Sequence, residues 1–434
     1  MLPAPLPILR RGVSLDPRSF GAKGDGRAKD TSAVQQALDR CAVLGGGDVV
    51  LADGIFRVGT LRIGSNTTLR IEQGAVLKGS DDIADYPVIQ VRWEGRWVSG
   101  HAALLWSQEA RNVQLTGGGR IVGSTGFAGR IAPSGLRHPA LMEFVEVIGL
   151  AVSDLSTEQG DMWSIHPVYC QDVRFSRLAV RGGADGIDVD SCRRVLIEDC
   201  RFDTADDCIS LKSGRGMEGA TIARPAEDVT IRDCSFSDRR WACIGIGSET
   251  SGGIRNVLIE RCRFLNAYTF SIYIKSRPGR GAFIENITMR DLEVAEAGQG
   301  FLRLNFLDSG KQDQFPVSGI EGIPRVGGFT FERVAVRNVP VLVDAVNIHP
   351  DKPLTGFTLR DIHGASRRGI ALANMQGVVL EGIHVDVKSG PMLTVTDVTG
   401  SGLEGAAKGI PVQRPPHVEA SAPFRLGEGL APPN

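Results

Sequence analysis

One short pattern returns along most of this sequence: an apolar residue, any residue, an apolar residue, two polar residues and another apolar residue. "VLIEDC" from Val195, "ITMRDL" from Ile287 and "FTLRDI" from Phe357 are examples. Other copies begin at Leu69, Val113, Leu150, Val173, Val229, Val257, Phe329 and Val378. Most intervals between copies lie between 21 and 44 residues, and the shortest are 21 to 23. A recurrent unit of this length indicates a repeat architecture.

Within each copy, apolar residues alternate with polar ones and many are β-branched, which predicts strands rather than helices. A strand that returns every 21 residues or so, with connections of variable length, is typical of the coils of a parallel β-solenoid. A Rossmann fold or a barrel of strands and helices would need helical connections. The connections here are too short and too rich in glycine for that. We therefore predict an all-β fold.

The two ends of the repeat region differ from its middle. Residues 30–47, "DTSAVQQALDRCAVLGGG", have a polar start, helical spacing of apolar residues and a glycine stop. They predict a helix that caps the first coil, within an N-terminal cap of about residues 18–48. We expect one β-helix domain over residues 1–400. Residues 401–434 are rich in Pro, Gly and Ala, and we interpret them as an extended or partly disordered tail.

Composition excludes several classes of partner. The formal net charge is −1, so neither nucleic acid nor an anionic membrane is indicated as a partner. No run of about 18 apolar residues is present, so no membrane-spanning helix is predicted. The N-terminal segment "MLPAPLPILRRGVSLDP" lacks a basic stretch followed by an apolar one, so no signal peptide is visible. No feature of the sequence indicates an oligomeric state.

Seven of the eight cysteines recur at similar positions of the coils when each coil is numbered from its first apolar residue; Cys41 lies in the predicted capping helix. Cys200, Cys234 and Cys262 are at offset 5, and Cys208 and Cys243 are at offsets 13 and 14. Cys170 and Cys192 are at offsets 20 and 19. We expect buried free thiols, which behave as small apolar side chains, because side chains stacked on neighbouring parallel strands meet poorly as disulfides. No spacing typical of a zinc site is present.

The same numbering brings three aspartates together. Asp185 is at offset 12 of the coil from Val173, and Asp207 is at offset 12 of the coil from Val195, with Asp206 beside it. Neighbouring parallel strands lie about 4.8 Å apart, so Asp185 and Asp207 are predicted to be direct neighbours. Crowded carboxyls differ in protonation, as a general acid and a general base require. Inverting glycoside hydrolysis uses two carboxyls about 6.5–9.5 Å apart.

Two tryptophans fall on the same set of positions. Trp163 is at offset 13 of the coil from Leu150, and Trp241 is at offset 12 of the coil from Val229. Acids flanked by aromatic rings are typical of a site that stacks sugar rings and cleaves between them. Two alternatives remain open: the aspartates could decorate solvated turns, or their oxygens could bind calcium.

From about residue 18 to 300, the chain resembles glycoside hydrolase family 28, the polygalacturonase-like pectinases. The resemblance rests on several blocks that occur in the order of the family. They are "SFGAKGDG" (19–26), "RIEQGAVLKGSDDIADYP" (70–87), "MWSIHPVYC" (162–170), "GADGIDVDSC" (183–192), "FDTADDCISLKSGR" (202–215), "IGSETSGGIRNV" (246–257) and "IKSRPGRGAFIENI" (274–287). The family consists of right-handed parallel β-helices that hydrolyse with inversion, so the resemblance implies that fold and that reaction.

The resemblance also implies roles for individual residues. Asp206 corresponds to the general acid, and Asp185 and Asp207 correspond to the residues that activate water. Lys275 matches the lysine that meets a substrate carboxylate. The other residues that the resemblance places around the substrate are Trp163, His166 and Lys212. No cofactor and no metal is implied.

Two positions depart from the family pattern. The family's Gly-His-Gly falls on Arg240-Trp241-Ala242, and its Arg-Ile-Lys falls on Tyr273-Ile274-Lys275. Arginine binds a carboxylate through two hydrogen bonds, which tyrosine cannot do. We therefore expect a retained hydrolytic reaction with an altered sugar next to the scissile bond, such as rhamnose or another neutral residue. The arginines near enough in sequence to replace the lost anion contact are Arg239, Arg240, Arg277 and Arg280.

The sequence thus predicts an inverting glycoside hydrolase that cleaves an α-linked bond in a pectin-type oligo- or polysaccharide. Trp241 and Tyr273 join Lys275 as expected substrate-binding residues. Two other functions are open: a catalytically lapsed β-helix that binds polysaccharide, and a lyase or epimerase that acts on uronates. The resemblance further implies secretion or a periplasmic location.

Overall fold

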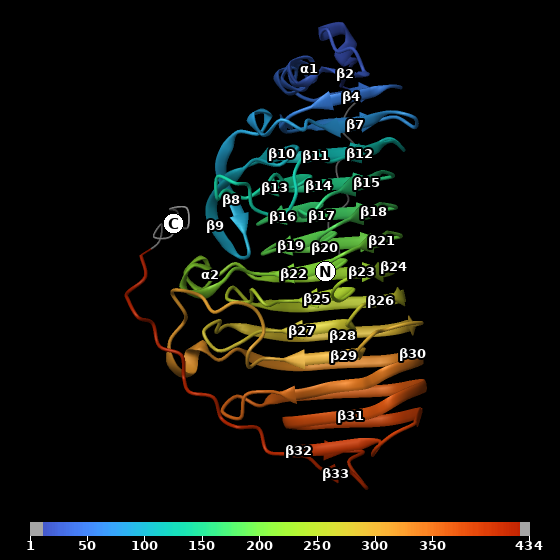
Figure 1. Cartoon of the computed structure of the whole chain (residues 1–434), viewed down its shortest axis with the longest axis vertical. Helices are drawn as coiled ribbons and strands as arrows, with labels where there is room; N and C mark the ends of the chain where they lie inside the picture. The colour runs from blue at the N-terminus through green and yellow to red at the C-terminus, as the bar shows by residue number, and fades with distance from the viewer. Residues whose placement is uncertain (1–11, 426–434) are drawn as a thin grey trace. The chain divides into compact units, whose positions relative to one another are not determined.

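The structure is a computed structural model that describes residues 12–425. The predictions made from the sequence for residues 1–11 and 426–434 therefore lie outside the described residues. The described residues form two compact units, one of residues 12–93 and 97–204 and one of residues 94–96 and 205–425. Each unit is a stack of short parallel strands (Figure 1). The fold is the right-handed parallel β-helix that the sequence predicts.

In the first unit the strands form three columns, and each strand pairs in parallel with the equivalent strand of the next coil. The first column consists of β1 (Val13–Leu15), β3 (Gly47–Leu51), β6 (Thr67–Ile71), β11 (Arg111–Thr116), β14 (Ile148–Ser153), β17 (Gln171–Ser176) and β20 (Arg193–Glu198). The second consists of β2 (Asp25–Lys29), β4 (Ile55–Val58), β7 (Val76–Gly79), β12 (Arg120–Val122), β15 (Ser156–Gln159), β18 (Ala179–Gly182) and β21 (Arg201–Thr204). The third consists of β5 (Leu61–Arg62), β10 (Leu105–Gln108), β13 (Met142–Val145), β16 (Ile165–Val168) and β19 (Ile187–Asp190).

The second unit continues the same plan with longer strands. One column holds β22 (Ile209–Lys212), β25 (Ile244–Ile246), β27 (Phe270–Lys275) and β29 (Gly300–Asn305). The other strands are β23 (Ala226–Arg232), β24 (Ser235–Asp238), β26 (Ile254–Asn266), β28 (Phe283–Val294), β30 (Arg325–Asn347), β31 (Leu354–Val387), β32 (Leu393–Ser401) and β33 (Ala407–Lys408). β30 and β31 each span more than one column, and the register of their pairing shifts between Val336 and Val339.

The strand register confirms the repeat that the sequence shows. In the first unit Val113 pairs with Leu150, which pairs with Val173, which pairs with Val195. In the second unit the first apolar residues of the copies are likewise paired, in the order Val229, Val257, Ile287, Phe329 and Phe357.

The earliest copy is an exception, because Leu69 pairs with Leu115 rather than with Val113. A shift of two residues keeps every side chain on its face, so an alternating pattern alone cannot detect it.

Polar side chains in the left-handed conformation mark the corners of the coils. Asp228, Asn256 and Asn286 have φ of 55°, 56° and 55°. Asp and Asn tolerate this conformation better than other residues that carry a Cβ atom. Their side chains also bind one another along the stack: Asn256 donates to Asp228 at 3.1 Å, and Asn286 donates to Asn256 at 3.2 Å. These hydrogen bonds link the bends of three successive coils.

The interior is filled by the alternating apolar residues and by thiols. All eight cysteines are buried and free, as predicted. Cys208 and Cys243 immediately precede the paired residues Ile209 and Ile244, so the two thiols lie on neighbouring rungs. Phe236 and Phe264 form a second ladder, with ring centroids 5.2 Å apart.

Helix α1 (Thr31–Val43) confirms the expected N-terminal helix. Its buried face consists of Ala33, Val34, Ala37, Leu38 and Cys41. Asp30 precedes it, but its carboxylate accepts the backbone N–H groups of Lys23 and Gly24 instead of capping the helix. The other short helices are α2 (Gly216–Ile222) and the 3-10 helices η1 (Pro17–Phe20), η2 (Ile83–Asp85) and η3 (Gly319–Gly322). None of the helices in residues 12–425 is long and apolar enough to cross a membrane.

The segment after β33 has no regular structure up to residue 425, and it contacts the second unit. Val418 accepts a backbone hydrogen bond from Gly319, and Arg414 pairs with Asp351 at 2.8 Å.

The stacked core generates a stability prediction. Phe264 is fully buried, whereas its neighbour Leu265 points outward and is 50% exposed. Phe264→Ala is expected to lower the free energy of unfolding by about 3–5 kcal/mol, because it leaves a cavity in the ladder. Leu265→Ala is the matched control, with an expected change within about 0.5 kcal/mol. Urea unfolding followed by circular dichroism measures both, and equal losses would contradict the assigned faces.

Candidate active site

Asp206 and Asp207 lie in a bend that immediately precedes β22 in the second unit. Asp207 is 3% exposed, and Asp206 is half-buried. The carboxylate of Asp206 accepts the backbone N–H of Asp207 at 3.1 Å, which holds the Asp206 side chain against the backbone of Asp207. Four other residues predicted from the sequence belong to the same unit as this pair: Lys212, Trp241, Tyr273 and Lys275.

Asp207 is positioned by an ion pair and by a glycine. Its Oδ2 lies 3.0 Å from Nζ of Lys275. On the intervening strand β25, a Cβ atom at Gly245 would lie 2.1 Å from the same Oδ2. Any side chain at residue 245 would therefore displace the carboxylate. The structure thus explains a glycine in the middle of a buried strand, where glycine otherwise destabilises.

Lys275 is enclosed by acidic and aromatic side chains. Its Nζ lies 5.3 Å from the ring centroid of Tyr273 and 5.7 Å from that of Trp241. Burial opposes the charge of Lys275, but the carboxylates of Asp207, Asp206 and Glu249 outweigh it and raise its pKa. The ammonium therefore stays charged and partly neutralises the acidic pair.

Glu249 is a buried carboxylate that the sequence reasoning did not single out, although it stands in the "IGSETSGG" block. It is 8% exposed. Burial raises its pKa, but the cations of Lys212, Arg280, Arg215 and Lys275 more than compensate and hold the pKa below its usual value. Glu249 thus contributes the negative charge that allows Lys212 and Lys275 to be buried.

Trp241 presents its ring to solvent and is 41% exposed. Its carbonyl accepts hydrogen bonds from the backbone N–H and the hydroxyl of Thr269, at 2.8 and 2.6 Å. The numbering of coils placed it beside Asp207, but the register is shifted by one residue. Ile209, which pairs with Ile244, is 14 residues after Val195, whereas Ile244 is 15 residues after Val229. Asp207 is therefore level with Ala242, because the turn before β25 contains one more residue.

Tyr273 does not project from the strand as an arginine would. Its hydroxyl contacts Ser309 Oγ at 2.8 Å and accepts a hydrogen bond from Asn305 at 3.3 Å, and the residue is buried.

Arg239, Arg240, Arg277 and Arg280 are near enough in sequence to supply a substitute anion contact. Arg280 does not supply one in this structure, because it is fully buried and donates to the carbonyls of Ser248 and Lys311. Arg303, which was not named from the sequence, pairs with Tyr273 on the next strand. Its guanidinium lies 5.5 Å from the Tyr273 ring centroid.

Asp238, at the end of β24, was also missed. It is fully buried and accepts the backbone N–H groups of Arg240 and Trp241. Burial raises its pKa to about 6; the two backbone hydrogen bonds oppose this rise and the charge of Asp206 adds to it. Its position three residues before Trp241 was the available signal. A carboxyl that titrates near neutral pH therefore lies behind the turn that carries Trp241.

The remaining predicted residues, Asp185, Trp163 and His166, belong to the first unit. Asp185 is buried and lies on the rung that follows Trp163: its carbonyl accepts the N–H of Ser164 at 3.0 Å. His166 is 1% exposed, with Nδ1 4.0 Å from Glu143 Oε1.

The expectation that Trp163 offers its ring face to a sugar is wrong for this structure, because Trp163 is 2% exposed. An inserted strand, β8 (Val88–Trp93), places Trp93 against it with ring centroids 4.8 Å apart. β8 forms a hairpin with β9 (Arg96–His101), and Arg92 on β8 binds Asp190 at 3.1 Å in the interior of the first unit. The sequence does not show which side chains such an insertion will cover.

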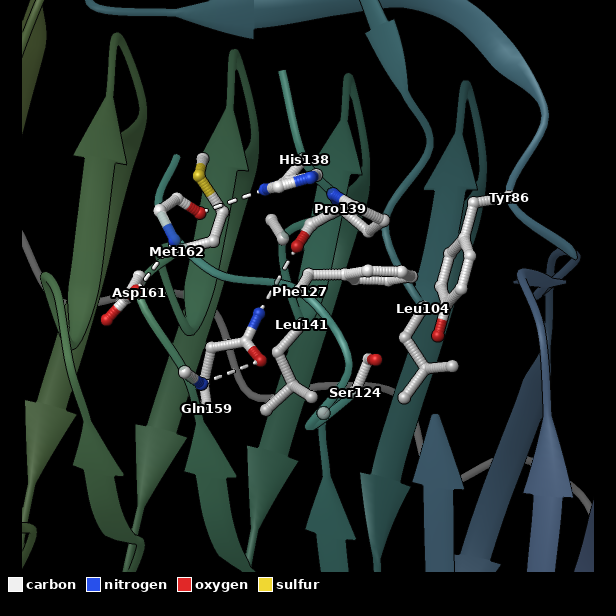
Figure 2. A pocket seen from close by; sticks show the side chains of 14 residues that line it. Tyr86, Leu104, Ser124, Phe127, His138, Pro139, Leu141, Gln159, Asp161 and Met162 are labelled. Carbon is white, nitrogen blue, oxygen red and sulfur yellow. Dashed lines mark hydrogen bonds between the residues drawn. The ribbon is translucent and has the colours of Figure 1, made fainter. Parts of the chain in front are cut away.

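Figure 2 shows a small cavity of the first unit. It is lined by 14 residues, among them Tyr86, Phe127, His138 and Met162. The Phe127 and His138 rings are stacked at 5.3 Å. The cavity holds about 20 Å³, enough for one water molecule and far too little for a sugar. In residues 12–425, no group of three His, Cys, Asp or Glu side chains is placed to hold a metal ion.

The buried Asp238 generates a pH prediction. Its folded-state pKa of about 6 lies above the ordinary value of 3.8, so its stabilising contribution is full below about 3.8 and is lost as the pH rises through 6. The melting temperature of the wild type is therefore expected to fall relative to that of Asp238→Asn between pH 5 and pH 7. Asp233→Asn is the control, because Arg261 lowers the pKa of Asp233 and moves its titration below this range. A pH-independent difference between wild type and Asp238→Asn would contradict the prediction.

Comparison with known proteins agrees with this arrangement. A probable polygalacturonase of Vitis vinifera is 27% identical over 360 residues, which cover 79% of this chain and 72% of that protein. An exo-poly-alpha-D-galacturonosidase of Dickeya chrysanthemi is 24% identical over 410 residues, covering 79% of this chain and 64% of that protein. The solved family 28 exopolygalacturonase of Yersinia enterocolitica shares the fold, with a TM-score of 0.77, 19% identity and coverage of 92% of this chain and 79% of that one. The sequence model of the family described as glycosyl hydrolases family 28 matches residues 75–323, more than half of the chain. The chain therefore belongs to glycosyl hydrolases family 28 and is a glycoside hydrolase.

Proposed function

We propose that this chain hydrolyses an α-linked glycosidic bond in a pectin-type saccharide, galacturonan or a rhamnogalacturonan-like polymer, with inversion. One observation carries the proposal: in a family 28 chain, the buried Asp207 is held over Gly245 and against Lys275, with Asp206 beside it. The names of the relatives, a polygalacturonase and an exo-poly-galacturonosidase, support a galacturonate-containing substrate.

In the proposed reaction Asp206 is the general acid. It protonates the glycosidic oxygen as the bond from that oxygen to the anomeric carbon breaks. Asp207 accepts a proton from the water that attacks the opposite face of the same carbon, which inverts its configuration. The sequence repeat supports Asp185 as a second group that activates this water. Asp206 is half-buried, which suits it to meet the substrate. Asp207 is paired with Lys275, which suits it to stay ionised and accept a proton.

Lys275 and the exposed ring of Trp241 are the proposed contacts to the sugar next to the scissile bond. Lys275 provides a single point charge, whereas an arginine at residue 273 would have provided a planar pair of donors. Tyr273 is already hydrogen-bonded to Ser309 and Asn305. We therefore propose that this sugar is bound by stacking and by one ammonium, which tolerates a neutral sugar such as rhamnose as well as a uronate. Lys212 is proposed to act on charge rather than on substrate, because it is buried near Glu249.

A polysaccharide-binding protein without catalysis is the second candidate, and the exposed Trp241 is the observation that favours it. The two functions differ in whether reducing ends are produced. A lyase would instead release an unsaturated product. A polymeric substrate of this class is met outside the cell, so we expect the protein to be exported or periplasmic.

The role of Asp206 generates the first prediction about activity. Asp206→Asn removes the proton donor but keeps the shape of the side chain, so kcat on galacturonan is expected to fall about 100- to 10,000-fold. Reducing-sugar release measures the rate, and proton NMR of the first product is expected to show the inverted anomer. Equal rates for the wild type and the variant would remove Asp206 from the mechanism, and an unsaturated product would indicate a lyase.

The position of Asp207 generates the second. Gly245→Ala would force Oδ2 of Asp207 away from its place, because the two atoms would be 2.1 Å apart. A displacement of this size is expected to lower kcat about a hundredfold while the fold is retained. Gly160→Ala is the matched control, since its added Cβ would lie 3.9 Å from the nearest atom, the carbonyl oxygen of Ser124. Full activity of Gly245→Ala would show that the position of Asp207 is not critical.

A further inference from the structure

The second unit contains a larger cavity away from Asp206 and Asp207. It has a volume of about 600 Å³ and lies along β27, β29 and the parts of β30, β31 and β32 that continue the same column. We call it the arginine groove and define it by Phe270, Gln299, Arg303, Asp344, Arg368 and Thr394. Its volume is within the range of small-molecule binding sites.

The arginine groove is continuous with the strand that carries Tyr273 and Lys275. The register runs from Tyr273 to Arg303, then to Asp344, Ala371 and Thr394, one residue per coil. Three coil spacings separate Arg303 from Thr394, so these four residues form a floor of the groove about 14 Å long. The floor is low at its centre, because Ala371 and Gly369 have little or no side chain. An extended ligand can therefore lie along the column.

The guanidinium of Arg303 is held in place by aromatic rings, but its hydrogen-bond donors are not used. Its guanidinium lies 5.6 Å from the Phe270 ring centroid and 5.5 Å from that of Tyr273. The nearest carboxylate oxygen, of Asp344, is 3.7 Å from Nε, which is too far for a hydrogen bond. Within residues 12–425 this guanidinium forms no hydrogen bond, although it carries five donors. The side chain is thus pre-positioned with its hydrogen-bonding capacity unused.

Arg368 adds a second cation on the same cavity. It is exposed, and among the described residues its side chain takes part in no hydrogen bond and no ion pair. Asp344 is the only acidic residue that lines the cavity in the described chain, so the two arginines leave an excess of positive charge. Each planar guanidinium can bind a carboxylate through two parallel hydrogen bonds.

A neighbouring hollow indicates that the ligand is a saccharide. It has a volume of about 740 Å³ and shares Gly298, Gln299 and Pro340 with the arginine groove. Tyr268, which lines it, is 61% exposed. An exposed aromatic ring offers an apolar face to the C–H face of a sugar, while its hydroxyl stays in water. The combination of an aromatic ring, polar side chains and two arginines without side-chain hydrogen bonds suits an acidic oligosaccharide better than a free small anion.

We propose that the arginine groove binds a uronate residue of the substrate at a distance from the scissile bond, with Arg303 and Arg368 contacting its carboxylate. This rests on the proposed function for the identity of the polymer. It gives a chain without an arginine at residue 273 a carboxylate contact one to three coils away from the cleavage point. The ligand class is an oligosaccharide that carries at least one free carboxylate.

The test measures binding separately from hydrolysis. In the full chain carrying Asp206→Asn, the Kd of an α-linked hexagalacturonate is measured by calorimetry, with and without Arg303→Gln or Arg368→Gln. Each arginine substitution is expected to weaken binding about tenfold, as the loss of one charge-assisted hydrogen bond requires. Arg263→Gln is the matched control, because Arg263 lies on β26 and is exposed and paired with Glu293; its Kd is expected to be unchanged.

The fully methyl-esterified hexamer has the same size without the charges. It is expected to bind more weakly and to be insensitive to either arginine substitution. An unchanged Kd for Arg368→Gln, an equal effect on the neutral ester, or no binding of hexagalacturonate at all would each overturn the proposal. Arg303 also contacts Tyr273, so Arg303→Gln can disturb the fold. In that case the result for Arg368→Gln alone decides the test. If the wild type does not hydrolyse galacturonan but both arginine substitutions weaken binding, the proposed function is wrong and the proposed uronate site is supported.

Discussion

The in-register stacking of parallel coils is the constraint on which the other features of this protein depend. A coil of about 21 residues cannot bury its apolar face alone, so every inward side chain must meet its equivalent on the next coil. The pairing of Val229, Val257, Ile287, Phe329 and Phe357 follows from this requirement. The same register aligns outward side chains into columns. A chain built in this way gathers residues far apart in sequence, such as Asp207 and Lys275, onto one face.

Burial of charge around Asp207 is the second organising element. Lys275 lies between the acidic pair, Glu249 and two aromatic rings, and its raised pKa shows that attraction exceeds the cost of burial. Glu249 in turn depends on Lys212, Lys275 and two arginines. Removing one member of such a network leaves another buried without compensation. The network therefore fixes the positions of the carboxylates that the proposed reaction needs, and Gly245 provides the space for them.

Trp241 and Tyr273 stand at the two positions that depart from the family pattern, and a cationic side chain, Arg303, still lies close to Tyr273. Trp241 offers a ring in place of an imidazole, with its backbone held by Asp238 and Thr269. Tyr273 turns its hydroxyl into the protein, and Arg303 on the next strand lies over its ring. In the proposed uronate site, the cationic contact lies one coil further along the column, at Arg303. Specificity in such a fold can shift by whole coils, because outward positions on successive strands are geometrically equivalent.

The sequence by itself determined the fold and the acidic pair. A period-2 pattern that recurs at coil length permits few other architectures, and the resemblance extends over many blocks. The strand register was predictable from the sequence with two exceptions. At Leu69 the register shifts by two residues, which an alternating pattern does not reveal. Before Ile244 the turn contains one more residue than the turn one coil earlier. Only the tertiary structure decided which side chains are covered. Trp163 is buried because an insertion places Trp93 on it, and Arg303 rather than Arg280 faces the groove because of the strand pairing. Local pattern fixes which face of a strand a residue occupies, but exposure depends on what the rest of the chain lays over that face.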